Sequence, residues 1–251
     1  VFDLFAEFPS IFNKWIVDVK HEYVGVSTKL EGIGVIAIGA NLLQYGDDLE
    51  YRTKDDVNPN IAGLKFSASD MAIQLGYGRN LNEKIDIGVN LNILRQTIGT
   101  DLSDKTRSGS YFGVALDGGV IFKEIIPGMD GAAVIKNLGY FSSGDKLNLT
   151  VRLGIKETLL SEKELMLSSD LNIPFFSQPS AHLGAEYILA KMLALRVGFK
   201  TDLMSLGGAA GFTAGLGFKV NNISIDIAYQ PFGDLGKLAG GIMKFSVTAG
   251  M

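Results

Sequence analysis

The feature that most constrains the fold of this chain is an alternation of apolar and small polar residues, clearest between Gly211 and Gly236. Every second residue of the first half is apolar: Phe212, Ala214, Leu216, Phe218 and Val220. The residues between them are mostly glycine and threonine. Asn221-Asn222 then predicts a tight turn, because asparagine tolerates positive φ. A second alternating run follows from Ile223 to Tyr229, so the stretch predicts a β-hairpin with one apolar and one small, polar face.

The face of small residues helps to decide between two kinds of β protein. The exposed side of a soluble sheet usually carries long Lys and Glu side chains, whereas the lumenal side of a membrane barrel accepts small polar ones while its apolar side contacts lipid. A soluble β-sandwich or jelly roll shows the same two-residue period and is the alternative. Alternating segments of about ten residues match the length that a tilted membrane strand needs, so the pattern favours a transmembrane barrel.

The connections between the alternating segments differ in length in a regular way. Short connections are predicted after the segments that end at Leu30, Gly78, Phe122, Ile155, Ile188 and Val220. Longer and more polar connections are predicted after those that end at Tyr45, Gln96, Leu138, Ile173, Lys200 and Tyr229. Transmembrane barrels have this asymmetry, with short periplasmic turns and longer external loops.

The number of strands follows from the direction in which they run. Thirteen strands are predicted from Trp15 onward, and the first, Trp15 to Leu30, runs in the same direction as the last. Antiparallel closure therefore needs one more strand, and Val1 to Phe8 is expected to supply it by pairing with Ile242 to Gly250. The prediction is an all-β fold in which residues 1–251 form a single domain, a closed antiparallel transmembrane β-barrel of about 14 strands.

Composition excludes several other classes of protein. Hydrophobic residues make up 47% of the 251 residues, which excludes a disordered chain. No run of about eighteen apolar residues predicts a membrane-spanning helix. The net charge of −4 comes without a basic patch, so nucleic acid is not an expected partner. No signal-peptide pattern begins the sequence, and an exported protein would be expected to start after it.

Few residues are suited to catalysis or metal binding. The chain has no Cys and only two His, His21 and His182. Either His could bind a metal or transfer a proton, but an ordinary strand position is the preferred interpretation. Loop carboxylates that could bind Ca²⁺ lack EF-hand spacing and are interpreted as solvated: Asp47, Asp48, Asp55 and Asp56. With no catalytic motif, the sequence predicts a protein that is not an enzyme and has no catalytic residue, cofactor or metal.

The polar residues on the inward face are the candidates for lining the lumen. They are Asp86, Asn90, Asn92, Asp117, Arg152, Asp170, Glu186, Arg196 and Asp226. Both signs of charge occur among them. The charged ones could pair across the lumen and close it, or they could line a channel. Pairing is the preferred interpretation.

A resemblance to a known family rests on short motifs in a fixed order. The C-terminal motif has Asp226, Ala228 and Tyr229, followed by Pro-Phe-Gly-Asp-Leu-Gly at 231–236. Earlier ones are Trp15 with Tyr23, Tyr45-Gly46-Asp47, Phe66-Ser67-Ala68-Ser69-Asp70, Lys136-Asn137-Leu138-Gly139 and His182-Leu183-Gly184-Ala185-Glu186-Tyr187. Together they cover nearly the whole chain and resemble the PorV/PorQ group of the FadL-like outer-membrane barrels.

This resemblance implies a place in the bacterial outer membrane and a function without catalysis. PorV-like members act as accessory subunits of secretion or surface-attachment machinery, and FadL passes hydrophobic molecules through the outer membrane. The expected function is an accessory or scaffold barrel in an envelope complex; the alternative is a transporter of hydrophobic small molecules. Expected partners are outer-membrane lipid and other envelope or surface proteins, bound through longer loops such as Gly46 to Asp70 and Thr201 to Ala209.

Two features of the family are not found in this sequence. The Gly-rich N-terminal segment with an Asn-Pro-Ala-Gly motif, which plugs the lumen in FadL-like proteins, does not occur. The final residues are Ala249-Gly250-Met251, whereas outer-membrane barrels commonly end on an aromatic residue. An N-terminal signal and plug are therefore expected to be absent from these residues, and a plugged or open lumen are both left as alternatives.

Overall fold

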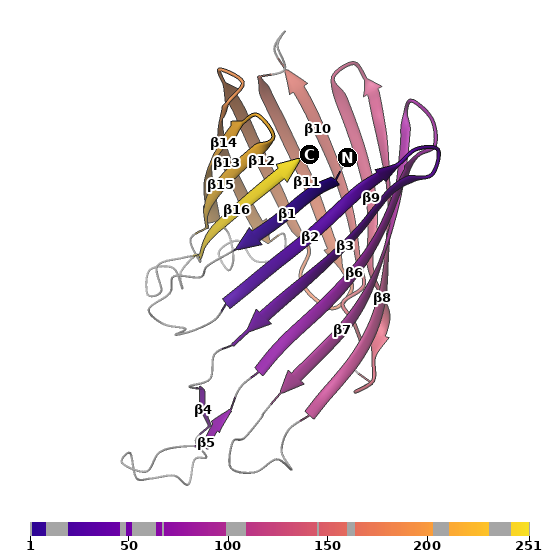
Figure 1. Cartoon of the computed structure of the whole chain (residues 1–251), viewed down its shortest axis with the longest axis vertical. Coiled ribbons are helices and arrows are strands. Elements are labelled where there is room, and N and C mark those ends of the chain that lie inside the picture. Colours follow the sequence, from indigo (N-terminus) through magenta and orange to yellow (C-terminus); the bar gives the residue numbers. More distant parts are fainter. Residues whose placement is uncertain are drawn as a thin grey trace.

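The alternating segments are β-strands that pair with one another in antiparallel order (Figure 1). The computed structural model describes residues 2–8, 20–45, 49–51, 64–66, 68–98, 109–144, 146–159, 164–202, 211–230 and 242–250. The described residues include no helix long and apolar enough to cross a bilayer.

The strands follow the predicted segments closely. Before the middle of the chain they are β1 Phe2–Phe8, β2 Lys20–Leu30, β3 Gly34–Gln44, β4 Leu49–Tyr51, β5 Leu64–Phe66, β6 Ala68–Asn80, β7 Ile85–Ile98 and β8 Gly109–Ile126. After it they are β9 Met129–Phe141, β10 Thr150–Leu159, β11 Leu165–Pro174, β12 Ser180–Leu189, β13 Leu193–Asp202, β14 Gly211–Val220, β15 Ile223–Gln230 and β16 Ile242–Gly250.

Thirteen of these strands form one continuous antiparallel sheet. It runs from β2 through β3 and β6 to β16, each strand hydrogen-bonded to the next. β4 and β5 pair only with each other and lie beyond the ends of β3 and β6 (Figure 1). β1 pairs with β16, with Ala6 opposite Val247. On its other edge β1 pairs with β2, with Ala6 opposite Val24. β1 therefore connects the two end strands of the sheet, β2 and β16.

Short turns and long connections are sorted to opposite ends of the sheet, as the loop pattern predicts (Figure 1). Residues 127–128 and 221–222 are the shortest turns, and the connections from β3 to β6 and from β15 to β16 are among the longest. Asn221 has φ 51°, so the Asn-Asn turn uses the left-handed conformation for which asparagine is suited.

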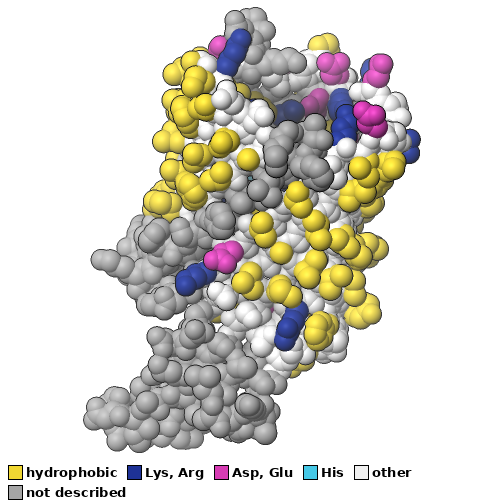
Figure 2. Space-filling view, in the orientation of Figure 1, with side chains coloured by type: hydrophobic (Ala, Val, Ile, Leu, Met, Phe, Trp, Pro, Cys, Tyr) yellow, Lys and Arg dark blue, Asp and Glu magenta, His cyan; other side chains and the backbone are white. Residues whose placement is uncertain are grey.

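The apolar faces point away from the lumen, and no hydrophobic core exists among the described residues. The only buried hydrophobic side chain there is Ala115, with 2% of its surface exposed, whereas Val89 is 55% and Leu153 is 46% exposed. Figure 2 shows apolar side chains spread over the outer surface. The predicted outward orientation of the apolar faces of β7 and β10 is therefore confirmed, and an apolar surface of this extent needs a nonaqueous neighbour.

Some predicted boundaries are wrong. The strand predicted from Leu147 to Ile155 begins only at Thr150 and continues to Leu159, while β9 extends into the predicted loop as far as Phe141. The predicted loop from Gly46 to Asp70 contains β4, β5 and the start of β6. Residues 15–19 of the predicted first strand, and the loop carboxylates Asp47, Asp48, Asp55 and Asp56, lie outside the described residues.

Candidate functional site: the lumenal face of the wall

The predicted lumen-lining residues all lie on the face opposite the exposed apolar side chains. On β7, Asp86, Asn90 and Asn92 alternate with the outward Ile87, Val89 and Ile93. Residues that are opposite each other in the register lie on the same face of the sheet. Asn90 is opposite Asp117 on β8, and Glu186 on β12 is opposite Arg196 on β13, so each of these pairs shares the inward face. The structure groups these residues into clusters along the wall, and none of the ion pairs between described residues crosses the lumen. The sequence-based hypothesis of pairing across the lumen is wrong for these pairs.

The first cluster is built from amides around one carboxylate. Asp117 Oδ2 accepts hydrogen bonds from Asn92 Nδ2 at 3.0 Å and Asn90 Nδ2 at 3.3 Å. Gln74 Nε2 on β6 donates to Asn92 Oδ1 at 3.0 Å. Only 6% of the Asn92 surface is exposed, so its amide must be satisfied by the protein, and this cluster does so.

A β-bulge completes the amide cluster. The register between β8 and β9 shifts between Leu116 and Gly118, and Asn137 on β9 takes φ 63°. Its backbone N–H turns to Asp117 Oδ1 at 2.8 Å, and its side-chain Nδ2 donates to the Asn148 carbonyl at 3.1 Å. The backbone pairing of β9 with β10 ends at Lys136 and Thr150, so this side-chain bond links the two segments where the ladder stops. Asn137 and Gln74 were not among the predicted lumen-lining residues. A bulge leaves no mark on a two-residue period, which explains Asn137, whereas the alternation along β6 already places Gln74 on the inward face.

The second cluster is ionic and spans four strands. Arg196 on β13 donates from Nε to Glu186 Oε2 on β12 at 2.5 Å, and from Nη1 to Asp226 Oδ1 on β15. The second contact passes over β14, where the inward residues Gly215 and Gly217 have no side chain to block it. A Cβ on Gly217 would lie 2.7 Å from Arg196 Nη1. The glycines that form the polar face of the β14–β15 hairpin therefore make room for the guanidinium group.

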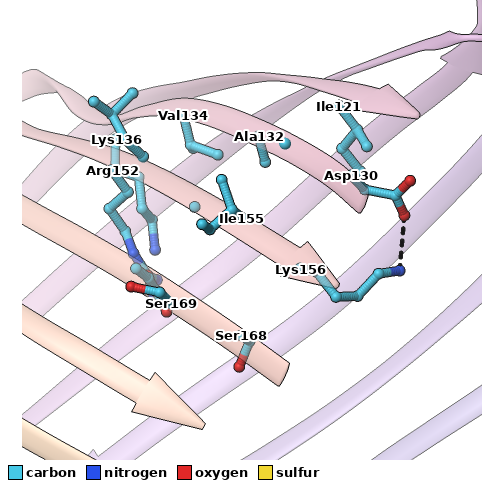
Figure 3. Close-up of a pocket in the computed structure, with 14 residues that line it drawn as sticks. Ile121, Asp130, Ala132, Val134, Lys136, Arg152, Ile155, Lys156, Ser168 and Ser169 are labelled. Carbon is cyan, nitrogen blue, oxygen red and sulfur yellow. Dashed lines mark hydrogen bonds and ion pairs between the residues drawn. The ribbon is translucent and has the colours of Figure 1, made fainter. Parts of the chain in front are cut away.

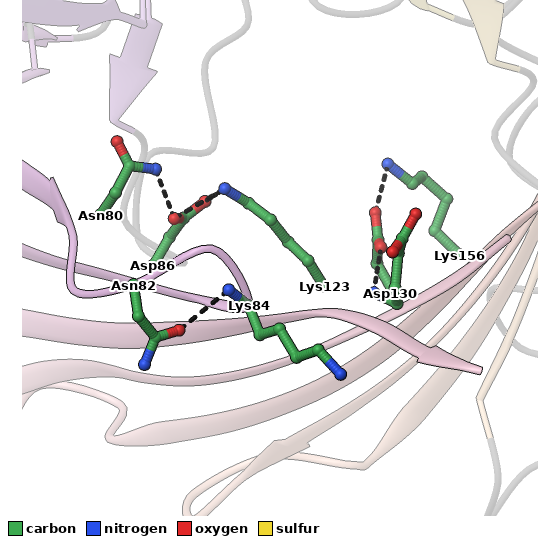
Figure 4. A network of polar contacts seen from close by, with 8 residues as sticks. Asn80, Asn82, Lys84, Asp86, Lys123, Asp130 and Lys156 are labelled. Carbon is green, nitrogen blue, oxygen red and sulfur yellow. Dashed lines mark hydrogen bonds and ion pairs between the residues drawn. The ribbon is translucent and has the colours of Figure 1, made fainter. Parts of the chain in front are cut away.

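The remaining predicted charges form single pairs with partners on a neighbouring strand. Arg152 Nη2 on β10 lies 2.6 Å from Asp170 Oδ1 on β11, and Lys123 Nζ on β8 lies 2.7 Å from Asp86 Oδ2 on β7. Figure 4 shows Asp86 between Asn80 and Lys123, and near them the pair of Asp130 with Lys156, whose charged atoms are 2.9 Å apart. Sequence reasoning missed Lys123 and Asp130, because both border the predicted β8–β9 turn. The alternation of residues along β10 already places Lys156 on the inward face.

A hollow of about 480 Å³ lies against β8–β11 (Figure 3). By the register its inward apolar lining is Ile121, Ala132 and Val134. The Asp130–Lys156 pair borders it at one end and Arg152 with Lys136 at the other (Figure 3). Ile121 is 44% exposed although it faces inward, so the lumen is open beside it. An apolar surface between two ionic borders can bind a small apolar molecule in an otherwise polar lumen.

The two histidines lie apart and hydrogen-bond to neighbouring side chains. His21 Nε2 is 2.7 Å from Asn41 Oδ1, and His182 Nε2 is 3.2 Å from Ser180 Oγ. No group of three or more His, Asp or Glu side chains in the described ranges is arranged to hold a metal ion.

Tyr45 joins the outer ends of two strands. It directly follows β3, and its hydroxyl donates to Asp70 Oδ2 on β6 at 3.1 Å. Partial burial, and then the negative charge of Asp70, raise the pKa of the Tyr45 phenol. The group therefore stays protonated and keeps donating this hydrogen bond at neutral pH.

Comparison with known proteins relates the chain by fold alone. No family model matches the sequence, and no curated protein matches it. The structure is similar to that of the Pseudomonas putida toluene transporter TodX, with a TM-score of 0.58 and 11% identity over 99% of this chain and 87% of that one. A deltaS2S3 mutant of TodX, described as a monoaromatic hydrocarbon channel, gives a TM-score of 0.60 and 10% identity over the same shares.

The likeness to TodX shows an all-β antiparallel fold of the kind found in outer-membrane transporters, and it leaves membership of the FadL-like family and of the PorV/PorQ group unshown. This fold, together with the exposed apolar surface, places the protein in the bacterial outer membrane.

Proposed function

We propose that the protein is an outer-membrane channel for small hydrophobic molecules and that it works without catalysis. The observation that carries this proposal is the hollow on the inward face of β8–β11, where Ile121 on β8 and Ala132 and Val134 on β9 form an apolar patch. Charged and polar inward side chains line the rest of it: Asp130, Lys136, Arg152, Lys156, Ser168 and Asp170. The inward charges pair along the wall, so these contacts leave the middle of the lumen free of ionic bridges. The fold, shared with a toluene transporter, supports the same function by analogy.

A channel needs a continuous wall, and we infer that the sheet closes into a barrel of fourteen strands in the membrane. The pairing of β1 with both β2 and β16 supports closure. Cysteines replacing Ala6 and Val247, which are opposite each other in the register, should then form a disulfide within one chain. If that pair and its neighbours in the register all fail to crosslink, the closed wall is disproved.

The competing hypothesis is an accessory subunit of an envelope secretion or surface-attachment complex, in the manner of the PorV/PorQ group. It is supported by the sequence motifs and by the two-stranded β4–β5 sheet, which adds a paired element to the long connection between β3 and β6. Such an element on a rigid barrel suits a binding role. We rank it second because the hollow with an apolar lining has no purpose in a purely structural subunit.

The channel proposal is tested by filling the hollow. Ala132→Phe should reduce the uptake of radiolabelled toluene severalfold in intact cells whose outer membrane carries the protein, because the ring occupies the space against Ile121 and Val134. The matched control is Ala133→Phe on the outward face of the same strand, which should leave uptake near that of the parent. Folding of both variants is checked by their heat-dependent shift on gels.

The two hypotheses give different outcomes in this experiment. If cells with and without the protein take up toluene equally, the channel proposal fails. Replacement of residues 49–65 by a Gly-Ser linker then becomes the decisive variant: loss of a copurifying envelope protein with an intact barrel would establish the accessory role.

A further inference from the structure

The outer, lipid-facing wall carries a cation that has no ionic partner among the described residues. Arg95 lies near the end of β7, on the same outward face as Val89 and Ile93. That end leads into the long connection to β8, so it is the external side of the membrane. The ion pairs found among the described residues do not include Arg95.

The geometry of Arg95 shows how its side chain meets the membrane boundary. Its guanidinium carbon lies 5.7 Å from the centre of the Phe112 ring, and Nε donates to Ser110 Oγ at 3.3 Å. Phe112 is directly opposite Arg95 in the register, and Ser110 is nearer the external end. The side chain therefore covers an apolar ring and extends toward the headgroup region, as long cationic side chains do at a membrane boundary.

Neighbouring residues extend this surface along the external rim. Phe112 is 57% and Tyr140 on β9 is 66% exposed. Lys146 is exposed and bridges to Tyr140 through the backbone, so both side chains leave the same face. Across the sheet, Arg95 and Lys146 are three chain spacings apart, about 14 Å. Along the strands they are offset by two residues, because Tyr140 is opposite Val114 whereas Arg95 is opposite Phe112. Aromatic rings flanked by cations suit a lipid whose acyl chains lie below a negatively charged headgroup.

Among the described residues, the outward carboxylate in the same register row as Arg95 is Glu22, and it is too far away to neutralise Arg95. Successive register pairs join Glu22 to Leu42, Leu42 to Met71 and Met71 to Arg95. Three strand spacings, about 14 Å, therefore separate the backbones of Glu22 and Arg95, and two apolar side chains lie between. At the membrane boundary, the phosphate of a lipid headgroup can supply the counter-charge that the described residues do not give Arg95.

We propose that Arg95, Phe112, Tyr140 and Lys146 form an external site for the phosphate-bearing headgroup of an outer-leaflet lipid. Arg95 binds the phosphate through the N–H groups that Ser110 leaves free. Phe112 and Tyr140 pack against the upper part of the acyl chains. The site lies on the lipid side of the wall, so it is separate from the lumenal hollow and independent of what passes through the lumen.

Native mass spectrometry of the purified, folded protein tests this site with bisphosphorylated lipid A as the probe. Arg95→Gln should weaken lipid A binding about fivefold, the effect of one interfacial cation. Arg95→Lys should retain most of the binding. The matched control is Arg79→Gln, an outward arginine at the opposite end of β6, which should bind lipid A like the parent.

Two results would overturn the proposal. One is equal loss of lipid A from the Arg95→Gln and Arg79→Gln variants, which would mean unspecific attraction. The other needs no variant: equal binding of lipid A and its dephosphorylated form by the parent protein would show that phosphate is not recognised. Failure of excess inorganic phosphate to displace lipid A is expected, because the acyl chains contribute to binding.

Discussion

Two regions of the lumenal wall satisfy their inward polar groups in opposite ways. In β6–β9 one carboxylate, Asp117, accepts hydrogen bonds from two side-chain amides on β7 and from the bulged backbone N–H of Asn137 on β9. In β12–β15 one guanidinium, Arg196, reaches over a strand of glycines to a second carboxylate. The first arrangement depends on a distortion of the backbone, and the second on missing side chains in a regular ladder. Neither arrangement bridges the lumen, which is why a polar wall and an open lumen are compatible.

The largest loss of stability is expected when a methyl group is added beside the bulge of the β6–β9 region. A Cβ on Gly139 would lie 1.8 Å from the Val114 carbonyl oxygen, and backbone cannot move aside as a side chain can. Gly139→Ala should therefore destabilise the barrel by about 3 kcal/mol or more. Gly118→Ala is the control, because nothing lies within 4 Å of its Cβ position. Urea unfolding in lipid vesicles measures both, and equal stability would contradict the close approach of β8 and β9.

Removal of the carboxylate in the amide cluster should have a smaller effect. Asp117→Ala leaves the Asn137 N–H and the Asn92 amide without their acceptor, at a cost of about 2 kcal/mol. Because the remaining partners are neutral, this cost should be nearly the same at low and high salt. A cost that disappears in high salt would show that long-range charge, and not local hydrogen bonding, holds the bulge.

Removal of the guanidinium should have the smallest effect and the clearest salt dependence. The Arg196 side chain is 40% exposed, so solvent screens its ion pairs and Arg196→Met should cost about 1 kcal/mol. Between about 0.05 and 1 M NaCl this cost should shrink toward zero, because salt screens an exposed pair. Parallel unfolding curves of the Asp117→Ala and Arg196→Met variants at both salt concentrations provide the comparison. The same salt response in both would remove the distinction drawn between the two regions.

The sequence was sufficient for the strands and for their two faces. Alternation over Ile85–Ile93 placed Val89 outward and Asn90 inward, and the register confirms both. It also placed Arg196 and Asp226 on the same side of the wall. It could not show that they meet, because the contact depends on the stagger of three strands and on the space at Gly217. The start of β10 was predicted too early for a similar reason. Asn148 makes hydrogen bonds with Asn137, Ser177 and the Phe176 N–H in place of strand pairing. These contacts cannot be predicted from the alternation of the sequence.

By itself, the sequence determined what is periodic: an all-β chain, one apolar and one polar face, and short turns at one end. These properties are local, because alternate side chains of any strand leave opposite faces and turn residues act over a few positions. Only the tertiary structure shows the properties that depend on how neighbouring strands are staggered. It determined that inward charges pair along the wall, that a bulge at Asn137 accompanies the end of the β9–β10 ladder, and that a hollow with an apolar patch opens against β8–β11. Each of these joins residues whose separation along the chain says nothing about their separation in space.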